Sequence, residues 1–377
     1  MLGYAIAFAV AAGVTWLTTP LVRRGAIRIQ AVVHPDDRRV HSAPTPTLGG
    51  AAMLIAFLAA MGVASRLPQF RPVFQGSSEP LGVVLAASVM FAVGLLDDLR
   101  EVSAPAKLAG QAFAASVLFL LGVTLFYFRV PFADIVVLSP DLAPLVTVLW
   151  VAVMANAVNF MDGLDGLAAG VVGIAAGAFF LYSHRLSDVG LLAPENIGPL
   201  LTAIVCGMCV GFLPHNFHPA RVFMGDSGSL LLGLLLAAAT MVVGGRTADQ
   251  FSGQTYFFFA PLFIGFVILG VPIFDTIWAV IRRARRRVSV TEADIQHLHH
   301  RLVQLGHGHR RAVLILWAWT AILSAVVLFP TFTNRGNAAV LPLIAGLGVG
   351  LYTLLHPDVR RRNLEPVPDE RSPSDAA

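Results

Sequence analysis

The chain has 377 residues, of which 56% are hydrophobic and only 13% are charged, and its formal net charge is +4. Soluble proteins carry about 25% charged residues, so this composition excludes an ordinary soluble domain and indicates a membrane protein. The modest positive charge and the absence of any nucleic-acid-binding motif argue against nucleic acid as a partner.

Apolar runs of about 20 residues predict an all-α polytopic fold with about eleven transmembrane helices. The expected spans are 2–22, 48–65, 80–96, 108–126, 143–159, 165–183, 197–213, 227–244, 256–281, 312–330 and 337–355. Residues 1–356 would form one membrane domain, with a short hairpin within 127–141. Residues 357–377, rich in Pro, Asp, Glu and Ser, are expected to be a disordered tail.

The basic residues predict how the chain is oriented. Arg23 and Arg24 follow the first span and none precedes it, so this span does not resemble a cleaved signal peptide. With eleven spans, all but six of the 26 Lys and Arg residues fall on one side. The positive-inside rule makes that side cytoplasmic, with the N-terminus outside and the C-terminus in the cytoplasm.

Polar residues recur at the end of the span expected at 143–159. Asn156, Asn159 and Asp162 are three residues apart, and Asp165 follows them. Residues at this spacing share one helical face if the helix continues to Asp162. Helix capping needs one or two such residues rather than four, so we interpret this stretch as the floor of a polar site.

Further acids occur at other cytoplasmic helix ends. Asp97 and Asp98 end the third expected span, where the negative helix pole disfavours carboxylates. A divalent cation could compensate for them, and so could Lys107, the only lysine of the chain. Taken separately, these residues also fit a hydrated helix end and an interfacial lysine. Asp226 opens another helix beside glycines that allow phosphate to approach backbone N–H groups.

Two cytoplasmic loops carry further cations. The first contains Arg38, Arg39 and His41, which fit either phosphate contacts or a solvated basic loop. The last contains His297, His299, His300 and Arg301. A histidine-rich segment also raises the alternative of zinc, but no Cys lies nearby and the carboxylates elsewhere suit a hard cation.

Carboxylates that converge in a partly desolvated cleft repel one another unless a cation binds them. Mg²⁺, or alternatively Mn²⁺, bound by a few protein oxygens and by substrate phosphates would resolve this repulsion. A metal, a lysine and a His/Arg loop at the lipid surface favour one reaction type. This is transfer of a phosphoryl-linked group from a soluble nucleotide donor to a lipid acceptor.

Four motifs resemble the polyprenyl-phosphate N-acetylhexosamine-1-phosphate transferases, in the right order over nearly the whole chain. They are Asp97-Asp98, Asn156-Ala-Val-Asn159-Phe-Met-Asp162-Gly-Leu-Asp165-Gly-Leu, Phe223-Met-Gly-Asp226-Ser-Gly-Ser and His297-Leu-His299-His300-Arg301-Leu302. The Arg39-Val40-His41 loop and the histidine motif resemble the WecA/TagO branch, which uses UDP-GlcNAc. Thr47, before Leu-Gly-Gly, is more like the MraY branch, which uses UDP-MurNAc-pentapeptide.

The resemblance implies a reaction in a bacterial plasma membrane, with the active site facing the cytoplasm. The phosphate of undecaprenyl or decaprenyl phosphate attacks UDP-GlcNAc, UMP leaves, and polyprenyl-diphosphate-GlcNAc remains. This product would begin the synthesis of a cell-envelope polysaccharide. Members of the family often dimerise, so a homodimer is left open.

The resemblance also implies a role for each residue of the motifs. Asn159 and Asp226 would bind Mg²⁺, and Asp97 or Asp98 would act as base or position the acceptor. The phosphate-neutralising residues would be Lys107, His297, His299, His300 and Arg301. The remaining substrate-binding residues would be Arg38, Arg39, His41, Asp162, Asp165, Asn216 and Phe223.

Three alternatives stay open at this point. The same chemistry could use another UDP-sugar, including the muramyl donor. A secondary transporter would explain helices interrupted by Gly and Pro, although transporter sites lie near the bilayer midplane rather than at helix ends. A structural membrane scaffold would leave the converging acids without a purpose.

Overall fold

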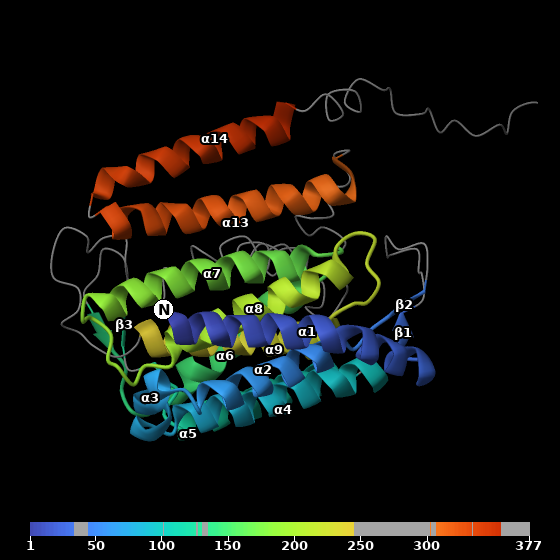
Figure 1. Ribbon diagram of the computed structural model, residues 1–377, viewed down its shortest axis with the longest axis horizontal. Coiled ribbons are helices and arrows are strands. Elements are labelled where there is room, and N and C mark those ends of the chain that lie inside the picture. Colours follow the sequence, from blue (N-terminus) through green and yellow to red (C-terminus); the bar gives the residue numbers. More distant parts are fainter. Residues whose placement is uncertain are drawn as a thin grey trace, which may run out of the picture.

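A computed structural model of the chain describes residues 1–33, 44–100, 102–125, 127–129, 135–244, 302, 307–333 and 335–355. Within these ranges the protein is a bundle of helices with two short β-hairpins. Figure 1 shows that the axes of the long helices are roughly aligned. Helices α13 and α14 lie along one side of the bundle, and α4 and α5 lie along the other.

The helices follow the apolar runs of the sequence closely. The first half contains α1 (Leu2–Arg28), α2 (Gly49–Ala64), α3 (Arg71–Gly76), α4 (Glu79–Arg100), α5 (Ala104–Leu120) and α6 (Leu142–Met161). The second half contains α7 (Leu167–Asp188), α8 (Gly198–Asn216), α9 (Gly225–Gly244), α13 (Gly308–Thr333) and α14 (Val340–Leu355). Short 3₁₀ turns at Pro68–Phe70 and Gly336–Ala339 precede α3 and α14.

Eight helical segments of the described residues are long and apolar enough to cross a membrane. A ninth results if α2 and the following segment Pro68–Gly76, bent by 91°, count as one span, and α5 is a shorter apolar helix. The prediction of a multi-pass α-helical membrane protein is therefore confirmed. Each expected span overlaps a helix where the structure describes it, although α5 ends at Leu120, short of the expected end at 126. The span at 256–281 and the tail at 357–377 lie outside the described residues, so the count of eleven stays a prediction.

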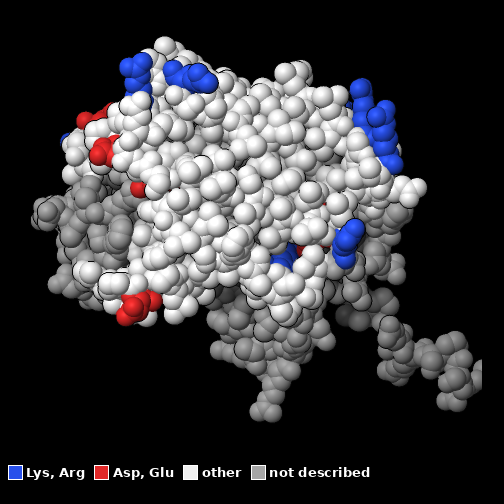
Figure 2. Space-filling model, turned by 90° about the horizontal axis from the view of Figure 1, so that it is seen from below, with Lys and Arg blue, Asp and Glu red and all other residues white. Residues whose placement is uncertain are grey.

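The two hairpins join consecutive helices. Strand β1 (Val32–Val33) pairs with β2 (Thr45–Pro46), and β3 (Tyr127–Arg129) pairs antiparallel with β4 (Ile135–Val137). The second hairpin confirms the expectation for 127–141. On the face shown in Figure 2, most charged side chains lie at the two ends of the bundle, and a wide uncharged surface separates them. This distribution matches helices whose middles face lipid tails.

Helix α9 lies at the centre of the bundle. Every residue from Ser227 to Gly244 is buried, and the helix packs against α2, α4, α6 and α8. Small residues at crossing points permit this close approach, because helices in lipid are held mainly by direct packing. A Cβ atom at Gly50 of α2 would collide with the backbone of Ser227 and Gly228, and one at Gly94 of α4 with the backbone of Asp226. The first turn of α9 is thus fixed by direct backbone contact on two sides.

We expect Gly94→Ala to lower the thermal stability of the purified protein and to displace the first turn of α9. Overpacking of this kind costs about 1–3 kcal/mol. Gly62→Ala in α2 is the matched control, because a Cβ atom there meets nothing within 4 Å and alanine is favoured over glycine in a helix. Equal melting temperatures for the two variants would contradict the close contact between α4 and α9.

Candidate active site

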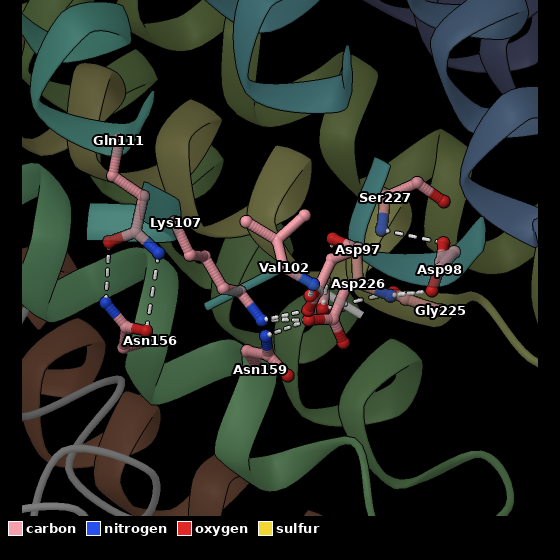
Figure 3. Close-up of polar contacts among 11 residues, drawn as sticks. Asp97, Asp98, Val102, Lys107, Gln111, Asn156, Asn159, Gly225, Asp226 and Ser227 are labelled. Carbon is pink, nitrogen blue, oxygen red and sulfur yellow. Dashed lines mark hydrogen bonds and ion pairs between the residues drawn. The ribbon is translucent and has the colours of Figure 1, made fainter. Parts of the chain in front are cut away.

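The polar residues at one end of the bundle meet at the carboxylate of Asp226. Lys107 Nζ donates to Asp97 Oδ2 at 2.8 Å and also contacts Asp226 Oδ2. Asn159 Nδ2 donates to the same Asp226 oxygen at 3.1 Å. Figure 3 shows these side chains converging from α4, α5, α6 and α9. Four helices that are separate in the sequence therefore contribute to one cluster, which we call the Asp226 cluster (Asp97, Lys107, Asn159 and Asp226).

The turn between α4 and α5 holds two members of this cluster in place. Asp97 lies in the last turn of α4, and its Oδ1 accepts a hydrogen bond of 2.6 Å from the backbone N–H of Val102. Helix α5 then begins after Ser103 with a proline in its first turn, where the missing N–H costs nothing. Lys107 follows one turn later, with its side chain only 17% exposed, and so it faces Asp97 across the turn.

Asp98 has a different environment from its neighbour Asp97. Its two carboxylate oxygens accept hydrogen bonds from the backbone N–H groups of Asp226 at 2.8 Å and Ser227 at 3.1 Å. Asp98 therefore caps the N-terminus of α9 from another helix and complements the positive end of its dipole. This contact positions Asp226 and the first turn of α9.

The segment before Asp226 is held by hydrogen bonds to β2 and to the start of α2. Phe223 N–H donates to the Pro46 carbonyl, and Gly49 N–H donates to the Phe223 carbonyl, both at 2.9 Å. Phe223 is half-buried. Thr47 is buried, and its hydroxyl lies beside the backbone of Gly225. Thr47 thus packs beneath the turn that leads into α9.

Asp165 and Asn216 are each only 2% exposed and hold the loop that follows α8. Asp165 Oδ2 accepts a hydrogen bond of 3.0 Å from the backbone N–H of Ala220 and lies 2.7 Å from His218 Nδ1. Asn216 accepts from the N–H of Gly166 and donates to the Val222 carbonyl, both at 3.0 Å. These side chains shape the loop, and their direct contact with substrate stays a prediction.

Asp162 lies just beyond the end of α6, because the helix ends at Met161 and does not continue as its polar spacing allowed. Burial, together with the negative charges of Asp226, Asp98 and Asp165, raises the pKa of Asp162 to about 8 from its usual 3.8. The carboxyl therefore lies in a strongly negative field, which is the field that attracts a cation.

The donor set fits a hard divalent cation that substrate phosphates help to bind. The described residues contain no group of three or more His, Cys, Asp and Glu side chains arranged to hold a metal. Mg²⁺, however, usually takes only one or two protein carboxylates and completes its shell with water and phosphate oxygens. Asp226 and the side-chain oxygen of Asn159 supply such donors, and the ammonium of Lys107 lies against the same carboxylate.

Several predicted residues cannot be placed. Outside the described residues lie Arg38, Arg39, His41, His297, His299, His300 and Arg301. The structure also adds His218 and Arg310, which the sequence did not single out as site residues. Arg310 Nη2 donates to the His218 carbonyl at 3.2 Å, and the rings of His218 and His309 stack at 5.4 Å. No local pattern links these residues, because α13 reaches this loop only in the tertiary structure.

Comparisons with known proteins agree with this geometry. Residues 80–244 match the model of glycosyl transferase family 4. The decaprenyl-phosphate N-acetylglucosaminephosphotransferase of Mycobacterium leprae is 39% identical over 94% of this chain and 90% of its own length. Its counterpart in Mycolicibacterium smegmatis is also 39% identical, over 93% and 87%. The phospho-N-acetylmuramoyl-pentapeptide-transferase of Desulforudis audaxviator is 35% identical, over 85% and 96%.

The matched segment contains the Asp226 cluster complete, and the similarity to these relatives extends over almost the whole chain. The chain therefore belongs to glycosyl transferase family 4, among its polyprenyl-phosphate sugar-1-phosphate transferases.

Proposed function

We propose that this protein transfers GlcNAc-1-phosphate from UDP-GlcNAc to a polyprenyl phosphate in the bacterial plasma membrane. An oxygen of the lipid phosphate attacks the β-phosphorus of the donor, the bond to the α-phosphate oxygen breaks, and UMP leaves. The product is polyprenyl-diphosphate-GlcNAc. The observation that carries this proposal is the single lysine held between Asp97 and Asp226 at one end of a bundle of apolar helices.

The residues of the cluster have distinct tasks in this reaction. The lipid phosphate is already an anionic nucleophile, so catalysis consists mainly of positioning and charge neutralisation. Lys107 can move from Asp226 toward a donor phosphate while it keeps its contact with Asp97. Mg²⁺ bound by Asp226 and Asn159 would neutralise the pyrophosphate. Asp97 or Asp98 acts as the base or positions the acceptor, and Asp98 also maintains the N-terminus of α9.

The membrane topology of the chain belongs to the same proposal. Residues 1–356 form one membrane domain of eleven spans, with 357–377 as a tail. The N-terminus lies outside and the site faces the cytoplasm, because arginines cluster at the end of the bundle that holds the site. Arg23 and Arg310 there donate to the carbonyls of Arg221 and His218. Arg38, Arg39, His41, His297, His299, His300 and Arg301 would bind the substrate phosphates, and association into a homodimer belongs to the same proposal.

Family membership argues against the transporter and scaffold alternatives, and the similarity to the GlcNAc branch supports the choice of sugar. The relatives named for decaprenyl-phosphate N-acetylglucosamine phosphate transfer are 38–39% identical over 93–94% of this chain, against 35% over 85% for the muramoyl-pentapeptide enzyme. Thr47 does not argue against this assignment, because it is buried and packs beside Gly225.

Purified protein in detergent, with undecaprenyl or decaprenyl phosphate and Mg²⁺, should move label from radiolabelled UDP-GlcNAc into the lipid phase and release UMP. Removal of the metal with EDTA should stop the transfer, and Mg²⁺ or Mn²⁺ should restore it. UDP-MurNAc-pentapeptide is the parallel donor. Label from the muramyl donor alone would keep the chemistry and overturn the choice of sugar.

Asp226→Ala should abolish metal-dependent turnover, because it removes the carboxylate on which Lys107 and Asn159 converge. Asp98→Ala should instead lower stability by about 0.5–2 kcal/mol through loss of a helix cap, and it should retain measurable binding of UDP-GlcNAc. Turnover by lipid-phase label and donor binding by calorimetry separate the two effects. Normal turnover of folded Asp226→Ala would disprove the metal assignment.

The stability of the metal-free protein should fall as the pH rises from about 5 to about 8. The folded protein keeps a proton on Asp162, whose pKa is raised from 3.8 to about 8, whereas the unfolded chain has released it. Rising pH therefore favours the unfolded chain across this window. Melting curves in EDTA should show a shallower decline for Asp162→Asn. Asp141→Asn, at the exposed start of α6, is the control and should keep the wild-type slope.

A further inference from the structure

Two amide side chains, Gln111 buried and Asn156 half-buried, form a reciprocal pair between α5 and α6. Asn156 Nδ2 donates to Gln111 Oε1 at 2.7 Å, and Gln111 Nε2 donates to Asn156 Oδ1 at 3.4 Å. Gln111 is 1% exposed. Asn156 Nδ2 also donates to the Ala152 carbonyl of its own helix at 2.8 Å, which fixes the orientation of its amide. The pair takes no part in the reaction described above.

This amide pair lies one helical turn from the Asp226 cluster on both helices. Gln111 follows Lys107 by four residues, and Asn156 precedes Asn159 by three, so each amide shares a helical face with a cluster residue. Figure 3 shows the pair beside Lys107 and Asn159, which both reach toward Asp226. The amide pair therefore joins the two helices, and one turn away both helices contact the same carboxylate oxygen.

A reciprocal amide pair specifies alignment more strictly than an apolar contact does. Leucines on the two helices could slide past one another at little cost in lipid, where packing is the main attraction. A shift of α5 along α6 would instead leave the buried amide of Gln111 and the half-buried amide of Asn156 without these partners, which is unfavourable away from water. The pair thus favours one register and one rotation of α5 against α6.

We propose that Gln111 and Asn156 are positioning residues that hold α5 and α6 in the register at which Lys107 and Asn159 meet Asp226. The consequence for turnover depends on the proposed function, whereas the consequence for the placement of Lys107 does not.

The chain contains a matched control for a purely structural role. Thr124, just beyond α5, and Thr147 of α6 form a buried hydroxyl pair at 2.9 Å. Thr147 lies nine residues before Asn156 in the same helix, which is about 13 Å along the axis. Loss of this pair should lower stability without disturbing the Asp226 cluster. The two pairs therefore separate stabilisation of the helix contact from placement of the lysine.

The first measurement reads the environment of Lys107 directly. Lys107 is the only lysine of the chain, so the α-amino group of Met1 is an internal reference for amine acetylation. We expect Gln111→Met to raise the acetylation rate of Lys107 severalfold relative to Met1 and Thr147→Val to leave it at the wild-type rate. The double variant Gln111→Asn with Asn156→Gln restores an amide pair of the same total length and should return the rate toward wild type.

The second measurement compares kcat and KM for the same proteins in the lipid-phase assay. Gln111→Met should lower kcat by about 10–100-fold with little change in KM for the donor, because the groups are present but misplaced. Thr147→Val should lower the melting temperature with kcat unchanged, and the exchanged pair should recover kcat. Equal acetylation and kcat in Gln111→Met and wild type would overturn the inference. Inactive wild-type protein would overturn the proposed function and leave the acetylation result to decide the positioning role.

Discussion

The ion pair between Lys107 and the carboxylates of Asp97 and Asp226 is the interaction on which the site depends. Asp226 lies in the first turn of the most buried helix, where an uncompensated carboxylate beside other acids would be costly. The lysine offsets that cost from a neighbouring helix. Because the ammonium is small and lies on a flexible stem, it can hold the acids together and still turn toward an anionic substrate.

The backbone around Asp226 is built to keep this carboxylate in one place. Asp98 caps α9 from α4, and Gly50 and Gly94 allow α2 and α4 to touch its first turn. The preceding loop is held by Asp165 and Asn216 beneath it. The acids therefore form two groups that the sequence does not distinguish. One group belongs to the Asp226 cluster, and the other holds the backbone around it.

The membrane setting explains why so many of these supports are polar. In an apolar bundle, hydrogen bonds and close backbone contacts select one arrangement among many that bury similar surface. Two such contacts lie near the same carboxylate: Asp98 with the N-terminus of α9, and Gln111 with Asn156. Placement accurate to a fraction of an ångström is what a transfer reaction without a strong base requires.

The sequence by itself determined the membrane class, the helices within the described residues, the hairpin at 127–141 and the residue types of the site. These properties are local, because the length of an apolar run and the spacing of polar residues are read along one segment. Only the tertiary structure decided that Asp98 caps a helix 128 residues away. It also decided that Asp165 holds His218, and that Gln111 meets Asn156. Such partners are brought together by helix packing, which no periodicity within one segment encodes.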